Sequence, residues 1–517
     1  MVNGPLILSF DVGTQSMRAL LVDTQGDILD KEQYSYPEAY FSPKPNWAEQ
    51  KPDFYYEVLC SISKKLMARN EDKASRVIAT VLAVIRDTVI CLDKDLKPLS
   101  NFIVWLDKRE TNKSAENVFS PFKKTLFSLV GMTDTVFMQY RQSVCNWLME
   151  NEPELWRKTY KFVLLPTYLN YRLTGNLIDS PENQIAHLPF DYKNRIWMKS
   201  GGLTRCLFDV PTEKLCDLIP AGSEIGTISP EKSRETGIPA GIPLIATGSD
   251  KSCETLGVSV TKPHQAALSF GTTATVQFTT KKFVEPKPFV PAYPSVCDGM
   301  YNPEIQIYRG YWMLSWFKKE FAEKECAEAE RLHCVAEELL NKHLDEVPPG
   351  CEGLILQPFW SPGVIFPNAR GSIDGFSDVH TKIHIYRAII EGIGYALMDG
   401  LYAMEKQAHT KITELFIAGG GSKSDTICQI TSDMFGLPVK RIQTHEACSL
   451  GAAMVGFKSK GVFSGFDEAI SSMVRVSSCF TPNSENHEVY KKLYSEVYSK
   501  LYSLLEPLYR KTKAITQ

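Results

Sequence analysis

The sequence has no long hydrophobic run, no excess of charge of either sign and no paired-cysteine motif. It contains no stretch of about 18 apolar residues, and the segment that begins at Met1 lacks a basic region followed by an apolar one. We therefore expect neither a membrane span nor a secretory signal. The 57 Lys and Arg residues nearly balance the 60 Asp and Glu residues, giving a net charge of −3, and no basic run is interleaved with aromatic residues. This pattern argues against nucleic acid as a partner.

The 13 cysteines are scattered from Cys60 to Cys479, with no Cys-x-x-Cys pair and no histidine at zinc-finger spacing. Unpaired cysteines pack as small hydrophobic residues, so we expect free buried thiols rather than disulfides or a zinc site. Together with the missing signal, this predicts a protein of the reducing cytoplasm.

The chain has 517 residues, more than the roughly 250 to 300 at which one hydrophobic core stops growing. At least two domains are therefore expected, with a cleft between them. The composition, with 44% hydrophobic and 23% charged residues, is that of an ordinary globular protein.

A glycine-containing hairpin opens the chain. The pattern predicts a strand over residues 6–10, the loop Asp11–Thr14 and a second strand over residues 17–22. A P-loop or a dinucleotide-binding fold would have a helix after the glycine loop, so the second strand argues against both.

A second hairpin repeats this order in the other half of the chain. Residues 266–270 lead into the loop Gly271–Thr273, and residues 274–278 follow as a strand. The repetition predicts a duplicated fold with a domain boundary near residues 258–262.

Both hairpins have a chemical use. Glycine lets the backbone approach an anion closely, and the N–H groups and threonine hydroxyls at Gly13, Thr14 and Gly271–Thr273 can donate to phosphate oxygens. A simple tight turn is the alternative for each loop. Asp11, at the end of a strand beside such amides, suits a ligand of Mg²⁺. Arg18 could face phosphate, although an exposed arginine on a strand is an equal alternative.

A third glycine cluster, Gly419–Ser422, lies between a strand over residues 415–418 and a helix over residues 424–435. A helix N-terminus carries a partial positive charge and free N–H groups, so this loop suits a phosphate or a ribose hydroxyl.

Asp250 follows an apolar strand over residues 243–246 and precedes a helix over residues 251–257. It is either the N-cap of that helix or a general base that takes the proton of an attacking hydroxyl. The further predicted elements are strands over 81–85 and 88–92, and a helix over 166–173 that follows the short apolar run 162–165 and stops at Gly175. A last helix is predicted over 487–505, and its tyrosine stripe favours core packing over a binding face.

With these motifs assembled, the chain resembles the FGGY family of carbohydrate kinases over almost its whole length. The resemblance is carried by Asp11–Thr14 with Arg18, Gly248–Asp250 with Gly257, Ser269–Thr273, Gly371–Phe376, His384–Ile385, Ala388–Glu391, Gly419–Ser422 and Glu446–Ala453. One segment departs from the family pattern: Trp147–Asn151 is retained, but Val144 stands where a lysine is usual and Arg141 replaces a small residue. Because this segment lies near the sugar in relatives, the substrate stays open.

The resemblance also indicates residues for the sugar. Trp105, in Trp105–Arg109, matches a Trp-x-Asp-x-Arg segment whose indole can cover the carbon face of a substrate, with a core tryptophan as the alternative. Arg86 and Asp87 resemble the Arg-Glu pair that grips hydroxyls in glycerol kinase, with an ordinary ion pair as the alternative.

The resemblance implies an α/β fold of two actin-like, RNase H-like domains of the ASKHA class, with ATP and substrate in the interdomain cleft. Residues 1–258 would bind the sugar, residues 259–505 the nucleotide, and residues 506–517 form a tail. The implied nucleotide-binding residues are Gly13, Thr14, Arg18, Gly271, Thr272, Thr273, Gly419, Gly420, Gly421 and Ser422.

The implied activity is ATP-dependent phosphorylation of a hydroxyl of a small sugar or polyol, with Asp250 as catalytic base and substrate contact and Asp11 as the Mg²⁺ ligand. A neutral ketose or polyol is favoured because an acid would lie near Asp87 and Asp250. Two alternatives remain, a catalytically altered sugar-sensing relative and an actin-like ATPase. The expected partners are the sugar and ATP, without nucleic acid or membrane, and a homodimer is one open option.

Overall fold

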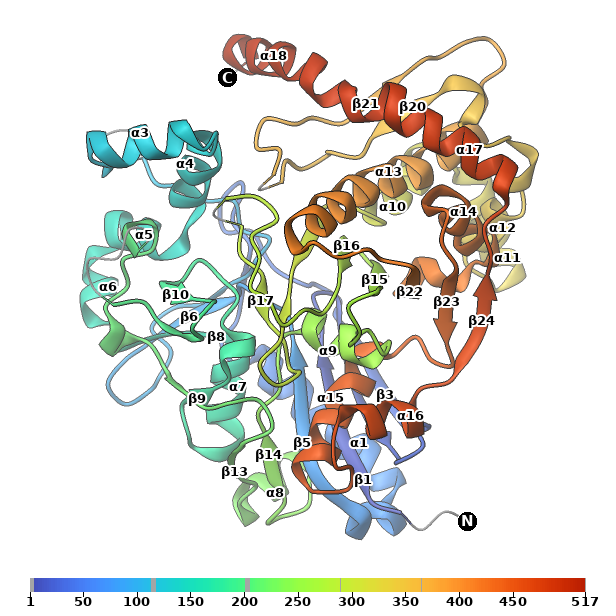
Figure 1. The fold of residues 1–517 in the computed structure, drawn as a ribbon. Helices are drawn as coiled ribbons and strands as arrows, with labels where there is room; N and C mark the ends of the chain where they lie inside the picture. The colour runs from blue at the N-terminus through green and yellow to red at the C-terminus, as the bar shows by residue number, and fades with distance from the viewer. Residues whose placement is uncertain (1–3, 113–117, 200–204, 289, 364, 517) are drawn as a thin grey trace. The chain divides into compact units, whose positions relative to one another are not determined.

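The computed structural model describes residues 4–112, 118–199, 205–288, 290–363 and 365–516 (Figure 1). The chain forms two compact units: the first holds the residues up to Ser259 with Tyr293–Tyr301 and Glu446–Val474, and the second holds Val260–Ala292, Asn302–His445 and the chain from Arg475 onward. The first division lies within the boundary region expected at 258–262. The predicted division at residue 258 did not include the two later segments that belong to the first unit. The roles assigned to the two domains stay predictions.

The first unit is built on a six-stranded sheet with the order β13-β14-β5-β1-β2-β3. Its strands are β1 Leu6–Val12, β2 Ser16–Val22, β3 Ile28–Ser35, β5 Val77–Val84, β13 Glu224–Thr227 and β14 Pro243–Ile245. β1 is buried along its whole length, because it lies at the centre of the sheet, antiparallel to β2 and parallel to β5. Apart from Ser9 and Asp11 its residues are apolar, as expected of a strand covered on both faces.

The helices that pack on this sheet include α1 Phe54–Arg69, on β2 and β3, and α15 Ala447–Ser459, on β1 and β5. The other helices of the first unit are α3 Pro121–Leu129, α4 Thr133–Gln142, α5 Val144–Asn151, α6 Pro153–Lys158, α7 Leu165–Thr174, α8 Pro230–Thr236, α9 Asp250–Gly257 and α16 Phe466–Met473. α7 ends as predicted, at Gly175, whose φ of +84° suits glycine at a helix C-terminus.

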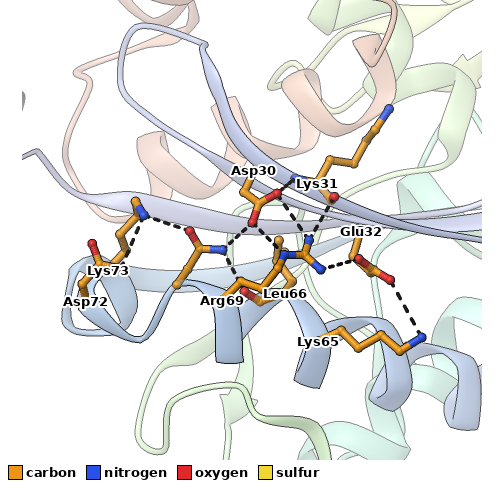
Figure 2. Close-up of polar contacts among 9 residues, drawn as sticks. Asp30, Lys31, Glu32, Lys65, Leu66, Arg69, Asp72 and Lys73 are labelled. Carbon is orange, nitrogen blue, oxygen red and sulfur yellow. Dashed lines mark hydrogen bonds and ion pairs between the residues drawn. The ribbon is translucent and has the colours of Figure 1, made fainter.

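Exposed charges tie the end of α1 to the edge strand β3 (Figure 2). Arg69 donates to Glu32 at 2.6 Å and to Asp30 at 3.3 Å, and Asn70 Nδ2 donates to Asp30 at 2.6 Å. Each exposed pair stabilises the fold by only about 0.2–1 kcal/mol. Charged side chains on an edge strand also hinder pairing with another chain.

A smaller sheet in the same unit has the order β4-β7-β6-β8. Its strands are β4 Glu49–Gln50, β6 Val89–Leu92, β7 Phe102–Ile103 and β8 Lys161–Leu164. Short pairs join β9 Ile178–Asp179 to β12 Asp217–Leu218, β10 Phe190–Asp191 to β11 Ile196–Trp197, and β17 Tyr293–Pro294 to β18 Tyr301–Asn302.

The second unit repeats the topology of the first sheet in the order β19-β16-β15-β22-β23-β24. Its strands are β15 Gln265–Phe270, β16 Ala274–Gln277, β19 Glu304–Ile307, β22 Glu414–Ala418, β23 Val439–Ile442 and β24 Val476–Phe480. β15 runs antiparallel to β16 and parallel to β22, as β1 does to β2 and β5. The predicted duplication is thus present at the level of the sheets.

The remaining elements of the second unit include its long helix, α13 Lys382–Ala408. The others are α10 Trp312–Phe321, α11 Glu323–Leu332, α12 Ala336–Asn341, α14 Asp425–Phe435, α17 Ser484–Lys492, α18 Ser499–Thr516, β20 Ile355–Gln357 and β21 Ser372–Asp374. In the described ranges, no helix is both long and apolar enough to cross a membrane.

The predicted single helix over 487–505 is wrong in its bounds. α17 passes through a π-helical segment, Leu493–Tyr498, into α18, which continues to Thr516 and includes most of the predicted tail. The core-packing interpretation holds for Tyr490 and Tyr498, which are buried. Tyr490 Oη donates to Glu391 Oε1 at 2.7 Å, so the stripe also completes a buried polar contact with α13.

The helices α9 and α15 cross at very short range. A Cβ atom on Gly257 would lie 2.0 Å from the carbonyl oxygen of Ala447, and one on Gly451 would lie 1.9 Å from that of Cys253. Only glycine permits this approach. Because α15 also packs on β1 and β5, the crossing joins α9 to the first sheet.

Candidate active site

Asp11 and Arg18 face each other on the paired strands β1 and β2. Arg18 Nη1 donates to Asp11 Oδ2 at 2.7 Å, and Arg18 Nε lies 3.6 Å from a carboxylate oxygen of Glu446. Glu446 also accepts from Lys31 at 2.8 Å. The structure therefore places Arg18 between two carboxylates, and its predicted contact with phosphate would require a change of partner.

Burial raises the pKa of Asp11 from 3.8 to about 6, with Arg18 acting in the lowering direction and the negative charges of Glu446 and Asp250 in the raising direction. Because burial disfavours the ionised form of Asp11, a positive charge placed beside the carboxylate would stabilise that form. Mg²⁺ is commonly bound by one or two carboxylates together with water and substrate phosphates. Among the described residues no group of three or more His, Cys, Asp or Glu side chains could hold a metal. The donor set at Asp11 thus fits a Mg²⁺ ion that is also bound by phosphate.

Asp250 is the first residue of α9. Its alternative interpretation as the N-cap is wrong, because Ser249 is the cap and its side chain accepts from the backbone N–H of Ser252. Asp250 Oδ1 accepts from the N–H of Lys251 at 2.8 Å and lies 3.7 Å from Arg86 Nε. Burial raises the pKa of Asp250, while Arg86 and Lys251 act in the opposite direction.

Arg86 and Asp87 are neighbours in the chain but have different partners. The Arg86 guanidinium lies beside Asp250 and 5.5 Å from the ring centre of Tyr293. Asp87 accepts from His187 Nδ1 at 2.7 Å and from the His187 backbone N–H at 3.2 Å. Asp87 has a φ of +52°, in the left-handed region that only a few per cent of non-glycine residues occupy.

Trp105 connects the two predicted sites of the first unit. Its Nε1 donates to Thr14 Oγ1 at 2.9 Å, and its half-buried indole packs against the core that β1 and α1 form. The Trp105 indole can therefore pack against the core with one part and still face a sugar with another. The hydrogen bond couples the position of the Thr14 hydroxyl in the first hairpin to the indole.

Other residues of the Trp105–Arg109 segment have local roles. Arg109 Nη2 donates to Glu49 and Asp107 at 2.8 Å each, and its guanidinium lies 3.9 Å from the ring centre of Trp47.

Trp147, retained from the family's N-terminal signature, packs edge-on against Trp47. Arg141 lies 3.9 Å from Glu110, with both side chains about 40% exposed. Val144 packs partly buried against the cluster around Trp147.

In the second unit the two predicted nucleotide loops lie next to each other, because they follow the paired strands β15 and β22. A Cβ on Gly419, whose φ is +84°, would lie 2.7 Å from the backbone of Phe270, which directly precedes Gly271–Thr273. Among the described residues other than its chain neighbours, none has an atom within 4 Å of a Cβ built on Gly420. Ser422 Oγ donates to the carbonyl of Gly419 at 2.7 Å and helps to hold the turn.

The structure brings together the eight residues predicted for the first unit, namely Asp11, Gly13, Thr14, Arg18, Arg86, Asp87, Trp105 and Asp250, while their roles stay predictions. Sequence reasoning missed His187, Tyr192 and Tyr293 as neighbours of the sugar residues. The rings of Tyr192 and Tyr293 are 5.4 Å apart, and Tyr293 belongs to the segment that returns to the first unit. No local motif indicates these three residues, since their proximity depends on contacts between distant segments.

Models of the FGGY family of carbohydrate kinases match this chain, the N-terminal domain over residues 6–257 and the C-terminal domain over residues 266–459. An uncharacterized sugar kinase, YgcE, of Escherichia coli K12 is 27% identical over 94% of this chain and 90% of its own length. A xylulose kinase of Staphylococcus epidermidis is 27% identical over 99% and 98%. A gluconokinase of Bacillus licheniformis is 26% identical over 94% of both chains.

Solved structures agree with the fold. A gluconate kinase of Lactobacillus acidophilus superimposes with a TM-score of 0.82 at 21% identity, covering 98% of this chain and 99% of that one. A glycerol kinase of Plasmodium falciparum with ADP superimposes with a TM-score of 0.74 at 20% identity, covering 96% and 98%. The predicted fold class, α/β with two actin-like domains, is confirmed. Because the family models match both halves of the chain, this protein belongs to the FGGY family of carbohydrate kinases.

Proposed function

We propose that this carbohydrate kinase transfers the γ-phosphoryl group of ATP to a hydroxyl of a neutral ketose or polyol, with Asp250 as the general base. The observation that carries the proposal is the position of Asp250, at the N-terminus of α9, 3.7 Å from Arg86 and within electrostatic reach of Asp11. A carboxylate beside an arginine but outside hydrogen-bond distance can accept the proton of a bound hydroxyl.

The proposed steps use residues of the first unit. Arg86 donates to substrate oxygens, Trp105 covers the carbon atoms of the sugar, and Asp250 takes the proton as the hydroxyl attacks the γ-phosphorus. Asp11 would hold Mg²⁺, which supplies positive charge to the phosphate oxygens when bound. Thr14 and the N–H groups of the first hairpin donate to phosphate.

The glycine loops of the second unit supply the proposed nucleotide contacts. The loops Gly271–Thr273 and Gly419–Ser422 lie side by side, and the open space at Gly420 lets a ligand approach the backbone. Exposed N–H groups in such loops bind phosphate or ribose oxygens. These contacts remain proposals for each residue.

The choice of a neutral substrate rests on charge. A carboxylate on the sugar would lie near Asp87 and Asp250, and like charges disfavour its binding. The names of relatives do not decide the matter, because the quoted xylulose kinase and gluconokinase are 27% and 26% identical to this chain.

Sugar-dependent ADP release tests the proposal. Purified protein with ATP and Mg²⁺ is assayed against pentuloses, hexuloses, polyols and aldonic acids, with D250N as the inactive control. ADP release without sugar would support the actin-like ATPase instead. Sugar-induced thermal stabilisation without turnover would support a sugar-sensing relative.

The proposed compartment is the reducing cytoplasm. All 13 cysteines lie in the described ranges and are free thiols: seven are buried, five are partly buried and Cys479 is exposed. Free thiols are usual in a reducing compartment. A homodimer remains a prediction that size-exclusion chromatography with light scattering can check.

A further inference from the structure

We propose that His187 is a specificity-determining residue of the sugar site, which binds a substrate oxygen through Nε2 while Asp87 fixes the orientation of its ring. This inference rests on the proposed function, since it assigns His187 to the same sugar as Arg86 and Asp250. No motif or resemblance indicates His187, and the geometry alone connects it to the site.

The Asp87 carboxylate is bound on both oxygens by His187. His187 Nδ1 lies 2.7 Å from Asp87 Oδ2, and the His187 backbone N–H donates to Asp87 Oδ1 at 3.2 Å. Both oxygens of the carboxylate expected to grip sugar hydroxyls are therefore engaged by one residue. Asp87 adopts this arrangement with a φ of +52°, and such backbone strain is found at functional sites.

The other ring nitrogen of His187 is Nε2, which does not face Asp87. Because Nδ1 carries the proton donated to Asp87, Nε2 accepts hydrogen bonds in the neutral ring and donates them in the imidazolium. The contacts of the described residues include no hydrogen bond to Nε2, and 23% of the His187 side chain is exposed. Nε2 is thus the polar atom that this pair can offer to a ligand.

His187 is connected by contacts to the residues proposed to bind the sugar. His187 pairs with Asp87, Asp87 adjoins Arg86, and Arg86 lies 3.7 Å from Asp250. A sugar that reaches Arg86 and Asp250 has hydroxyls a few carbon atoms away. Nε2–H of the imidazolium can donate to such a hydroxyl oxygen or to a keto oxygen, and a donor with a full charge forms a strong hydrogen bond.

The protonation of His187 depends on its neighbours. The charge of Asp87 raises the pKa of His187 against the opposing effect of burial. Burial raises the pKa of the Cys145 thiol, whose Sγ donates to the His187 carbonyl, to about 12, so this group stays neutral. Burial also raises the pKa of Tyr192. Phe208 packs edge-on against the ring, and Arg86 is the charged residue beside Asp87.

The expected result is a change in sugar affinity rather than in phosphoryl transfer. H187A should raise KM for the sugar by about 10- to 100-fold, because one charge-assisted hydrogen bond is lost. The value of kcat should stay within a few-fold of the native one. In the native protein kcat/KM should fall as pH rises beyond the ordinary histidine value of about 6.5, because the donor form is lost. That alkaline decline should be absent in H187A.

The experiment measures kcat and KM between about pH 6 and 8.5 for xylulose, ribulose and xylitol, the last of which lacks a keto oxygen. H187Q serves as a second variant that keeps a polar group, should H187A fail to fold. D87N should move the alkaline decline to lower pH, since it removes the charge that favours the imidazolium. H343Q is the matched control, because His343 Nδ1 lies 2.8 Å from Glu346 on the surface of the second unit. It should behave as the native protein does.

The outcomes separate the two proposals. If the native protein releases ADP with sugar but both His187 variants keep the native KM and the native pH profile, the role of His187 is overturned while the kinase function stands. If the native protein shows no sugar-dependent ADP release with any substrate of the panel, the proposed function itself fails. A fall in kcat alone would assign His187 to the chemical step and also overturn the inference.

Discussion

Replacing Asp11 by asparagine should stabilise the protein without ligands and inactivate it. Asp11 is 8% exposed, and burial raises the pKa of its carboxyl group from 3.8 to about 6, so the folded state disfavours the ionised form. A displacement of this size corresponds to about 3 kcal/mol, because each pKa unit is worth 1.36 kcal/mol. The neutral amide of asparagine avoids that cost while it keeps the shape of the side chain.

The sign of the pH dependence follows from linkage. The pKa of Asp11 is raised in the folded state, so its contribution to the free energy of unfolding is greatest below about pH 4. The free energy of unfolding falls by up to about 3 kcal/mol as pH rises through 6. Asp11→Asn should remove this loss. The variant should therefore exceed the native protein in unfolding free energy at pH 8, and the difference should shrink towards zero near pH 4.

The assay is denaturant and thermal unfolding of both proteins without nucleotide or metal, between about pH 4 and 8. Asp23→Asn is the matched control: Asp23 is also buried, but its Oδ1 accepts from the backbone N–H groups of Gln25 and Asp27 at 2.9 Å each. It should show no such gain. A variant at Asp11 that is no more stable than the native protein at pH 8, or whose gain is the same at pH 4, would refute the electrostatic reasoning.

The remaining predictions concern catalysis and packing. Asp250→Asn should lower kcat by about 10² to 10⁴ while ATP binding, measured by calorimetry, persists; turnover within a few-fold of native would exclude the base role. Arg86→Ala should lower kcat/KM for neutral sugars by about 10-fold or more, and an unchanged value would contradict hydroxyl binding. Gly451→Ala should cost several kcal/mol or prevent folding, because its Cβ would lie 1.9 Å from the Cys253 carbonyl; a native melting temperature would show that the helices can separate.

Local patterns accounted for the parts of the fold that depend on local chemistry. The alternation of strand, glycine loop and strand predicted β1–β2 and β15–β16, and Gly175 marked the end of α7. Ser249 is a local signal for the start of α9, because serine is a favourable N-cap and its use leaves Asp250 inside the first turn. The pairing of Arg18 with Asp11 could also have been read from the register of a short hairpin.

Local sequence patterns did not predict the contacts between distant segments. Residues 446–474 return to the first unit because α15 crosses α9 at Gly257 and Gly451, and two glycines alone do not reveal their partner. His187 and Tyr293 approach Asp87 and Arg86 from separate segments, so no spacing in the sequence relates them. The residues proposed for phosphoryl transfer could therefore be predicted from local motifs, whereas His187 and Tyr293 beside the sugar residues could not.

The two carboxylates with proposed chemical roles each face an arginine, at different distances. Arg18 donates to Asp11 at 2.7 Å, whereas Arg86 Nε lies 3.7 Å from Asp250, beyond a hydrogen bond. A metal at Asp11 must therefore compete with a formed charge-assisted hydrogen bond, while a hydroxyl at Asp250 does not. Displacement by the metal would release Arg18 towards an anion, so the proposed roles of Asp11 with Mg²⁺ and of Arg18 with phosphate are coupled. The burial that destabilises ionised Asp11 is, in this arrangement, also what favours a cation beside it.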